Sequence, residues 1–564
     1  MKAASELAVC LRGVSFVYDG ASEPALREVN LAVGRGQMVV VMGPSHAGKS
    51  TLAKILNRTV PAFQSGSLRG EVWLLGQRCS NETVADFAGR IGLVAQDFEA
   101  QLFSTSVECE VAFALEQFGI APAAMRERVR RAMRAVGLEG FEQRDPATLS
   151  GGEKQRLAIA SMLALEPELL VFDEPTTDLD PAGKEEVLAV LAALRAQGRT
   201  LVVVEHETFA AEMADWLVFM VGGEVVRQGS PGELLRDVEL CLRCAVRPPD
   251  TAVLAKGYGW PEVPTTIEAA AAKLEAQIAK VQPVESAARD REPVRGAAPP
   301  LLEVDRVSVR YRDAAQPALE NISFSVRAGE LIALLGQNGS GKTTLAKCLN
   351  GLLPPAAGEV RWRGVPLAEL PLSKRAAAVG YVFQNPDYQI FADRVYDEVA
   401  FGPRNVGLSA EEVQARVGEA LTAVDLLPRA DDDPFWLTKG ERQRLAVASL
   451  LALRPEVLVL DEPTTGLDYR EQRQMMELVR KLQTQGMAVI IITHSVWLAA
   501  EYAKRVLLLR SGRLVFDGSV AELFAQRELL ESARLRVPAA VELGQRYGLS
   551  VRSADELVDI LRGG

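Results

Sequence analysis

Hydrophobic and polar positions follow the same order twice along the chain. Short apolar runs predict buried strands at QMVVVM (37–42) and ELIALL (330–335), and each is followed by a glycine-rich turn and a predicted helix. Alternating runs that predict strands precede them, LRGVSFVYDG (11–20) and VDRVSVRYRD (304–313). The pattern indicates an internal repeat of strands and helices, which favours an α/β fold in each copy.

Later apolar runs keep the same order. LLVFDEP (169–175) and VLVLDEP (457–463) predict strands that end in paired carboxylates, and each is followed by an apolar run that ends at a histidine. Matching positions in this part lie 288 apart, whereas the lysines of the earlier glycine-rich turns lie 293 apart. The difference indicates a five-residue insertion in the first copy, between Asn57 and Gly70.

The two glycine-rich turns, GPSHAGKST and GQNGSGKTT, fit the pattern G-x-x-x-x-G-K-[ST]. Its glycines let backbone N–H groups close on phosphate oxygens, its lysine (Lys49, Lys342) reaches the β- and γ-phosphates, and its hydroxyl (Ser50, Thr343) ligates Mg²⁺. The predicted phosphate-binding residues are Gly43, Pro44, Ser45, His46, Ala47, Gly48, Lys49, Ser50 and Thr51, and Gly336, Gln337, Asn338, Gly339, Ser340, Gly341, Lys342, Thr343 and Thr344.

Paired carboxylates at the end of a buried strand are costly unless a cation lies beside them, and Mg²⁺ supplies one. We assign Asp173 and Asp461 to the metal, and Glu174 and Glu462 to orienting or deprotonating the attacking water.

Two glutamines and two histidines recur at the same offset as the carboxylates. Gln96 and Gln384 leave strand-like runs 288 positions apart, which favours a role near the metal and the attacking water. His206 and His494, two of only three histidines, follow strands at the same spacing, and we interpret both as contacts to the γ-phosphate.

A capping-box pattern occurs in LSGGEKQR (149–156) and in LTKGERQR (437–444), so each predicts a helix start whose N–H groups can receive an anion. The candidate anion-binding residues are Ser150, Gly151, Gly152, Thr438 and Gly440. Tyr18 and Tyr311 also occupy matching places. Alternation alone leaves a cross-strand aromatic and an adenine-stacking ring equally favoured, and the repeat favours stacking.

Composition limits the class of protein. The 564 residues carry a net charge of −11, which argues against a protein that coats nucleic acid. The sequence has no run of 18 apolar residues and no signal-peptide core at its start, so we expect a cytoplasmic chain that does not span a membrane by itself. Among six scattered cysteines, only Cys241 and Cys244 have metal-like spacing, and a helical core is favoured over zinc.

Each repeat ends in a stretch that predicts a helical tail, and a segment rich in proline, alanine and charge separates the repeats. We predict a first α/β domain, its tail, a linker, a second α/β domain and its tail at residues 1–235, 236–280, 281–300, 301–524 and 525–564.

The ordered set of aromatic, phosphate loop, glutamine, LSGGE, DEP and histidine resembles an ATP-binding cassette (ABC) ATPase, twice over. FQNPDYQIF, DEVAFGPRNVGLS, the tails and LTKGERQR are similar to the tandem ATPases of energy-coupling factor (ECF) importers, which take up vitamins or transition-metal ions. The resemblance implies two P-loop domains, ATP and Mg²⁺ as cofactors, integral membrane partners (a coupling protein and a substrate-binding protein), and a peripheral place on the cytoplasmic face of the membrane.

The resemblance also implies an intramolecular dimer in which each ATP lies between the two halves. Thr438 and Gly440 would close the site of Lys49, and Ser150 and Gly152 would close the site of Lys342. His46 and Lys439 depart from the family pattern, where glycine is usual, and both fall on the first site. We therefore expect slower turnover there.

Two other classes share this layout. Ribosome-associated ABC-F ATPases also join two cassettes, but they have a long charged helical linker, whereas the linker here is short and not basic. The tandem ATPases of sugar importers are less similar in the NPDYQIF and LTKGE segments. The import function therefore rests on family resemblance, and the transported solute stays open.

Overall fold

A computed structural model describes residues 4–80, 82–264, 266–278, 299–312 and 316–563. The chain divides into two compact units. The first comprises Met1–Ala252 with Asp468–Arg470, and the second comprises Val253–Leu467 with Glu471–Gly564.

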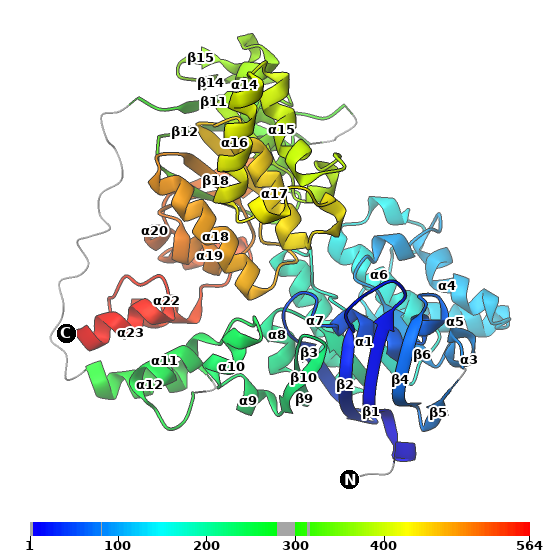
Figure 1. Ribbon diagram of the computed structural model, residues 1–564. Helices are drawn as coiled ribbons and strands as arrows, with labels where there is room; N and C mark the ends of the chain where they lie inside the picture. The colour runs from blue at the N-terminus through cyan, green and yellow to red at the C-terminus, as the bar shows by residue number, and fades with distance from the viewer. Residues whose placement is uncertain (1–3, 81, 265, 279–298, 313–315, 564) are drawn as a thin grey trace. The chain divides into compact units, whose positions relative to one another are not determined.

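The first unit is built around a six-stranded sheet with strand order β10-β9-β3-β8-β7-β6, parallel except for the β9–β10 pair (Figure 1). Every residue of β3, β7 and β8 is buried, as expected for parallel strands covered on both faces. The strands are β3 (Met38–Met42), β6 (Ile91–Val94), β7 (Leu169–Asp173), β8 (Thr200–Val204), β9 (Trp216–Val221) and β10 (Glu224–Gly229).

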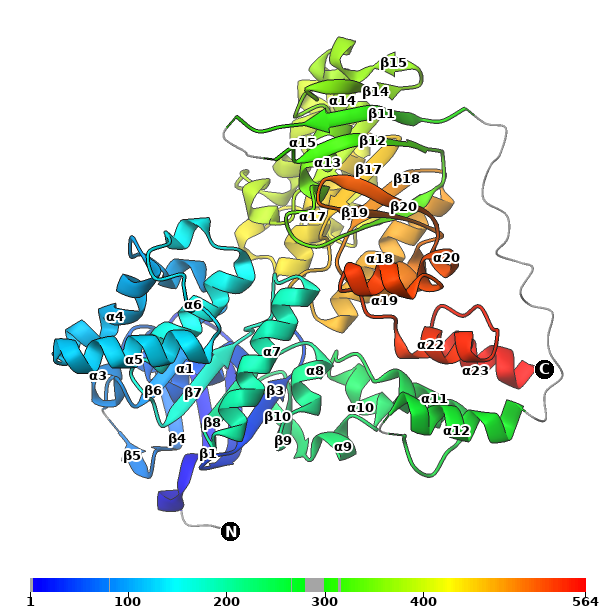
Figure 2. The same ribbon diagram turned by 180° about the vertical axis from the view of Figure 1, so that it is seen from behind.

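Alternate residues of β3 enter different cores. Met38, Val40 and Met42 pack with helices α4, α5, α6 and α7, whereas Val39 and Val41 pack with α1 and a four-stranded antiparallel sheet of order β2-β1-β4-β5 (Figure 2). That sheet contains β1 (Leu7–Tyr18), β2 (Leu26–Gly34), β4 (Gly66–Leu74) and β5 (Gln77–Cys79). The helices are α1 (Lys49–Leu56), α2 (Thr59–Ala62), α3 (Val84–Phe87), α4 (Val107–Gln117), α5 (Pro122–Ala135), α6 (Gly151–Leu163), α7 (Pro181–Ala196), α8 (Thr208–Glu212), α9 (Pro231–Leu234) and α10 (Val238–Arg243).

The second unit repeats this plan, with sheets of order β16-β17-β18-β13-β19-β20 and β12-β11-β14-β15. The strands are β11 (Leu302–Val309), β12 (Leu319–Val326), β13 (Leu331–Leu335), β14 (Ala357–Trp362), β15 (Val365–Pro366), β16 (Val379–Val382), β17 (Val457–Asp461), β18 (Ala488–Ile492), β19 (Arg505–Arg510) and β20 (Arg513–Ser519). The helices before its tail are α13 (Lys342–Leu349), α14 (Leu372–Ala378), α15 (Val395–Asn405), α16 (Ala410–Ala423), α17 (Lys439–Leu451), α18 (Tyr469–Thr484), α19 (Val496–Tyr502) and α20 (Val520–Phe524). The predicted tandem α/β fold is confirmed.

Both predicted capping boxes are present. Ser150 is the N-cap of α6 and exchanges hydrogen bonds with Glu153, and Thr438 caps α17 with Glu441 in the same way. The glycine-containing first turn of each helix therefore begins where the sequence predicts it.

The tail of the first repeat is shared between two cores. Cys241 lies in α10 and Cys244 is the C-cap of that helix, and both are fully buried in the first unit's core, which confirms the helical-core prediction for this pair. Further on, α11 (Asp250–Tyr258) and α12 (Ile267–Ile278) pack with α22 (Ala539–Arg546) and α23 (Ala554–Gly563) of the second repeat. The second tail also contains α21 (Arg527–Ser532).

Leu254 and Leu274 meet Leu543 and Leu557 in this tail core, and the Tyr547 hydroxyl donates a hydrogen bond to the Ala271 carbonyl at 2.8 Å. Residues 279–298, most of the predicted linker, lie outside the described residues. Over the ranges that the structure describes, no helix combines the length and apolar character needed to span a bilayer.

Candidate functional site

The two phosphate loops follow β3 and β13, and neighbouring strands hold both closely. Gly43 has a φ of 155°, and a Cβ added there would lie 2.0 Å from the Met220 carbonyl oxygen on β9. Gly336 has a φ of 154°, and its added Cβ would lie 2.4 Å from the Leu509 oxygen on β19. Only glycine fits this turn, so the motif's first glycine has a steric cause in both repeats.

The loop lysines occupy equivalent places at the starts of α1 and α13, and both are buried. The Lys49 ammonium donates to the carbonyl oxygens of Gly43 (2.9 Å) and Pro44 (2.8 Å). The Lys342 ammonium donates to those of Gly336 (2.7 Å) and Gln337 (2.9 Å). Each loop therefore places a cation beside a helix N-terminus, an arrangement suited to a polyphosphate.

A hydroxyl contacts the candidate metal carboxylate in each half. The Ser50 hydroxyl donates to Asp173 Oδ1 at 3.1 Å, and Thr343 forms a side-chain hydrogen bond with Asp461. Burial, and then the charge of Glu174, raise the pKa of Asp173 to about 6, and burial also raises the pKa of Asp461. Mg²⁺ prefers oxygen ligands of this kind, and its charge would offset the cost of burying the carboxylates, so the residues fit this metal.

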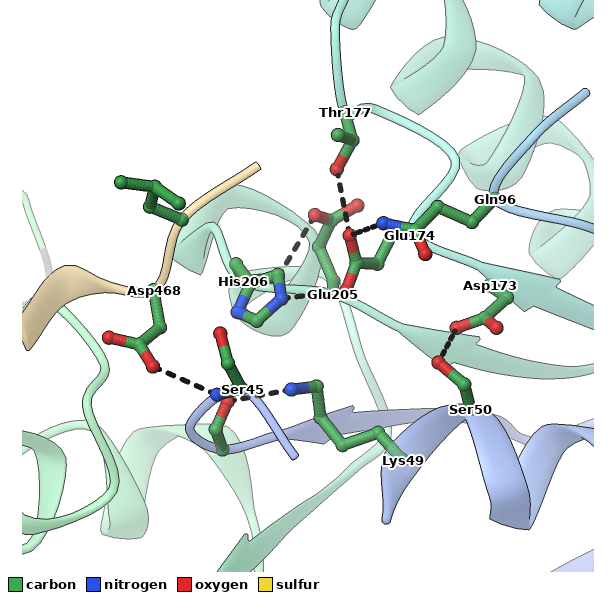
Figure 3. Close-up of polar contacts among 12 residues, drawn as sticks. Ser45, Lys49, Ser50, Gln96, Asp173, Glu174, Thr177, Glu205, His206 and Asp468 are labelled. Atoms are coloured by element: carbon green, nitrogen blue, oxygen red, sulfur yellow. Dashed lines mark hydrogen bonds and ion pairs between the residues drawn. The ribbon is translucent and has the colours of Figure 1, made fainter. Parts of the chain in front are cut away.

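Glu174 is the centre of the first group of candidate catalytic side chains (Figure 3). Its Oε2 accepts hydrogen bonds from Gln96 Nε2 (2.7 Å) and from the Thr177 hydroxyl (3.2 Å), and its Oε1 lies 2.7 Å from His206 Nε2. These residues follow β6, β7 and β8, three neighbouring parallel strands whose carboxyl ends meet at one edge of the sheet. We call this group the first cluster; it comprises Lys49, Ser50, Gln96, Asp173, Glu174 and His206.

Glu462 has a related but different environment. Its Oε2 accepts a hydrogen bond from the Thr465 hydroxyl (3.2 Å), and its Oε1 lies 3.0 Å from His494 Nδ1. Burial acts to raise the pKa of Glu462, but His494 and Lys342 lower it overall. The described residues show no hydrogen bond between Gln384, which follows β16, and Glu462. The second cluster is Lys342, Thr343, Gln384, Asp461, Glu462 and His494.

Several neighbours of these clusters were not predicted from the sequence. Thr177 and Thr465 stand 288 positions apart in the TT pairs after DEP, so the repeat itself contained the signal. Tyr381, whose hydroxyl donates to Asp461 Oδ2 at 2.9 Å, has Leu93 at its counterpart position and could not have been found from the repeat. Glu205 is buried beside His206 and has Thr493 as its counterpart.

The two predicted departures from the family pattern differ in their structural effect. His46 has a φ of 61°, in the left-handed region that favours glycine, where its counterpart Gly339 has 75°. Lys439 is the first residue of α17. A Cβ added to its counterpart Gly151 would meet Leu179 at an ordinary 3.6 Å, so a side chain fits at this helix position without a clash.

The predicted adenine-stacking tyrosines both lie next to the phosphate loops. The Tyr18 hydroxyl is 3.1 Å from the hydroxyl of Thr51, and the Tyr311 hydroxyl is 3.2 Å from that of Thr344. Tyr18 also packs edge-on against Phe16. The contacts place both rings at equivalent positions, and the stacking role stays a prediction.

The profile of the ABC transporter family matches residues 26–177 and 319–465, and a profile for an AAA domain matches residues 433–500. TTE1589 of Caldanaerobacter subterraneus subsp. tengcongensis, assigned by name to the ABC transporter ATP-binding proteins, is 44% identical over 98% of this chain and 99% of its own. A relative from Methanosarcina acetivorans, assigned by name to the same group, is 40% identical over 95% of this chain and 89% of its own. The solved structure of cbiO1 from Clostridium perfringens, titled part of the ABC transporter complex cbiONQ, is 33% identical, covers 44% of this chain and 100% of its own, and has a TM-score of 0.39.

Proposed function

Because the chain belongs to the ABC transporter family and is an ATPase with two ATP-binding domains, we propose that it powers a membrane importer of the ECF type. The solute would be a vitamin, a vitamin precursor or a transition-metal ion. ABC ATP-binding proteins generally work with membrane components, and here these would be a coupling protein and a substrate-binding protein. The chain would then act as a peripheral subunit on the cytoplasmic face of the membrane.

A repeated pair of exposed phenylalanines carries this proposal. Phe103 and Phe113 form an edge-to-face pair with ring centroids 4.6 Å apart, and Phe391 and Phe401 form the matching pair at 4.7 Å. The four rings are exposed to 64%, 40%, 59% and 48%. Exposed apolar rings grouped on a surface mark sites of protein association.

A buried glutamate fixes the loop under each pair. Glu110 Oε2 accepts hydrogen bonds from the backbone N–H groups of Phe103 (3.0 Å) and Ser104 (2.8 Å), and Glu398 Oε2 accepts from those of Phe391 and Ala392, both at 3.0 Å. A carboxylate with several N–H donors is a strong local anchor, so both loops present their ring at a set position. The same docking element is therefore built twice, in the segments that follow Gln96 and Gln384.

We propose the same division of labour among the side chains of both clusters. Lys49 and Lys342 bind the β- and γ-phosphates, and Tyr18 and Tyr311 stack on adenine. Glu174 and Glu462 orient or deprotonate the attacking water, with Gln96 and Gln384 beside them, and His206 and His494 contact the γ-phosphate.

Bound Mg²⁺, held by Ser50 and Asp173 in one cluster and by Thr343 and Asp461 in the other, would neutralise charge that develops on the phosphates. Gln96 and Gln384 would lie in reach of it as further oxygen ligands.

In this proposal the halves act as an intramolecular pair. The helix start at Thr438 and Gly440 would close the first ATP site, and Ser150, Gly151 and Gly152 would close the second. Support comes from the capped starts of α6 and α17, whose N–H groups can receive phosphate oxygens. Closure on ATP and opening after hydrolysis would move the membrane partner.

The test is to extract the tagged chain gently from its own cells with detergent and to identify what co-purifies. We expect two small hydrophobic membrane proteins, and we expect the double variant Phe103→Ser with Phe391→Ser to lose them, because both docking pairs lose a ring. Phe63→Ser is the matched control, since Phe63 is 76% exposed but lies outside the docking segments. Recovery with ribosomes and without membrane proteins would contradict the transport assignment.

A further inference from the structure

Glu205 is a carboxylic acid buried in the first unit. It follows β8, immediately before His206, and only 1% of it is exposed. Its Oε2 accepts a hydrogen bond from the Thr176 hydroxyl at 2.9 Å, and its Oε1 accepts one from the backbone N–H of His206 at 3.0 Å. Its own N–H donates to the Val41 carbonyl oxygen on β3 at 3.1 Å.

These contacts join the two loops that carry the catalytic candidates. Thr176 lies two residues after Glu174, and His206 Nε2 lies 2.7 Å from Glu174 Oε1 (Figure 3). The Glu205 side chain therefore bridges the loop after β7 and the loop after β8. A change in the bridge would change how His206 and Glu174 face each other.

The second unit does not use a carboxylate at this place. The counterpart of Glu205 is Thr493, which is also 1% exposed, and its hydroxyl accepts a hydrogen bond from the backbone N–H of Ser495 at 3.0 Å. Thr464, the counterpart of Thr176, is buried as well. The buried acid is therefore specific to the first cluster.

We propose that Glu205 is a positioning residue of the first ATP site, which joins the loops that carry Glu174 and His206 and weakens nucleotide binding once it is ionised. This inference rests on the roles proposed above for Glu174 and His206. A second negative charge near Glu174 opposes a γ-phosphate that carries the same sign, and the low dielectric of a buried site strengthens that repulsion.

Burial, followed by the charges of Glu207 and Glu174, raises the pKa of Glu205 to about 7. Glu174 faces it from the loop after β7, His206 and Glu207 from its own loop, and Lys184 of α7 forms an ion pair with Glu207. Because burial raises the pKa above 4.5, the ordinary value for a glutamate, the neutral side chain prevails below about pH 7. The folded chain therefore binds this proton more tightly than the unfolded chain does. The resulting contribution to the free energy of unfolding is complete below about pH 4.5 and is lost as the pH rises through about 7.

The experiment isolates the first site in the full-length chain with Lys342→Ala, which removes the phosphate-binding lysine of the second loop. Binding of a fluorescent ATP analogue with Mg²⁺ is then measured across neutral pH, with and without Glu205→Gln. We expect affinity to fall about tenfold as Glu205 ionises, and we expect Glu205→Gln to abolish most of that fall because an amide stays neutral. Glu205→Thr, which installs the second repeat's residue, should act in the same way.

The mirror background Lys49→Ala reports the second site. There Glu205→Gln should change nothing, and Thr493→Glu should introduce a loss of affinity at high pH. If the pH dependence of binding is the same with and without Glu205→Gln, or with and without Glu205→Thr, the role of Glu205 is overturned. The first site would still stand as a nucleotide site in that case. No binding by the Lys342→Ala protein at any pH would overturn the first site as a nucleotide site, and the inference with it.

Discussion

The first and second clusters share their backbone and differ in the side chains around it. Glu174 and Glu462 both adopt left-handed φ values, 52° and 49°, after equivalent strands. Each loop lysine donates to the carbonyl oxygens of the first two residues of its own phosphate loop. The neighbours differ: Gln96 donates to Glu174, whereas a tyrosine donates to Asp461. Equal catalytic groups can therefore stand in unequal electrostatic surroundings within one chain.

The two residues that depart from the family pattern both belong to the proposed first ATP site. His46 lies in the first phosphate loop, and Lys439 begins the helix proposed to close the first site. A non-glycine residue at positive φ costs energy, and a lysine at a helix N-terminus opposes the dipole until an anion is bound. We hypothesise that the first site binds ATP but turns over more slowly, while the second carries most hydrolysis.

The strongest test of this comparison replaces each catalytic glutamate in turn. We expect Glu462→Gln to lower the ATPase rate of the assembled transporter by about 100-fold, because a general base contributes on that scale. Glu174→Gln should leave that rate nearly unchanged, because the first site contributes little of the total hydrolysis. Steady-state phosphate release at saturating Mg²⁺-ATP measures both. Equal losses would end the proposed asymmetry.

A smaller effect should follow from Tyr381, a neighbour of the second cluster that has Leu93 as its counterpart in the first repeat. Tyr381→Phe removes the donor to the buried Asp461, so we expect the second unit to lose about 1–2 kcal/mol of unfolding free energy and to need several-fold more Mg²⁺. Thermal unfolding and a Mg²⁺ titration of ATPase activity check this. The control is Leu93→Met at the counterpart position in β6, which should change neither the unfolding free energy nor the Mg²⁺ requirement. If Tyr381→Phe leaves the Mg²⁺ requirement unchanged, Tyr381 has no role at the metal site.

The smallest expected effect concerns His46. His46→Gly should relieve the left-handed strain and raise the unfolding free energy of the first unit by about 0.5–1 kcal/mol, while the mirror change Gly339→His lowers that of the second. If this residue slows the first site, His46→Gly should also raise the ATPase activity that remains after Glu462→Gln. No rise there would assign the slower turnover to Lys439 or to another neighbour.

Much of the fold followed from the sequence because the repeat supplied two observations of each motif. The strands before each phosphate loop, the capping boxes at Ser150 and Thr438, and the buried helix containing Cys241 all appear where the pattern predicted them. Periodicity and capping chemistry are local, so a single sequence shows them.

The sequence did not show which side chains from distant segments would meet. Tyr381 is hidden inside an ordinary strand pattern, and only the pairing of β16 with β17 brings it to Asp461. Glu205 stands in an apolar run where an ionised side chain is disfavoured, and its partner Thr176 lies in a different loop. Both depend on sheet order, which no local pattern encodes.

The tail core ties the ends of the two repeats together without a peptide bond. Helices α11 and α12 belong in sequence to the first repeat, yet their apolar side chains share one core with α22 and α23. A cut anywhere between residues 279 and 298 would therefore yield two polypeptides that still share a folded domain. The covalent link then fixes the one-to-one stoichiometry of the repeats, whereas the tail core does not depend on that link.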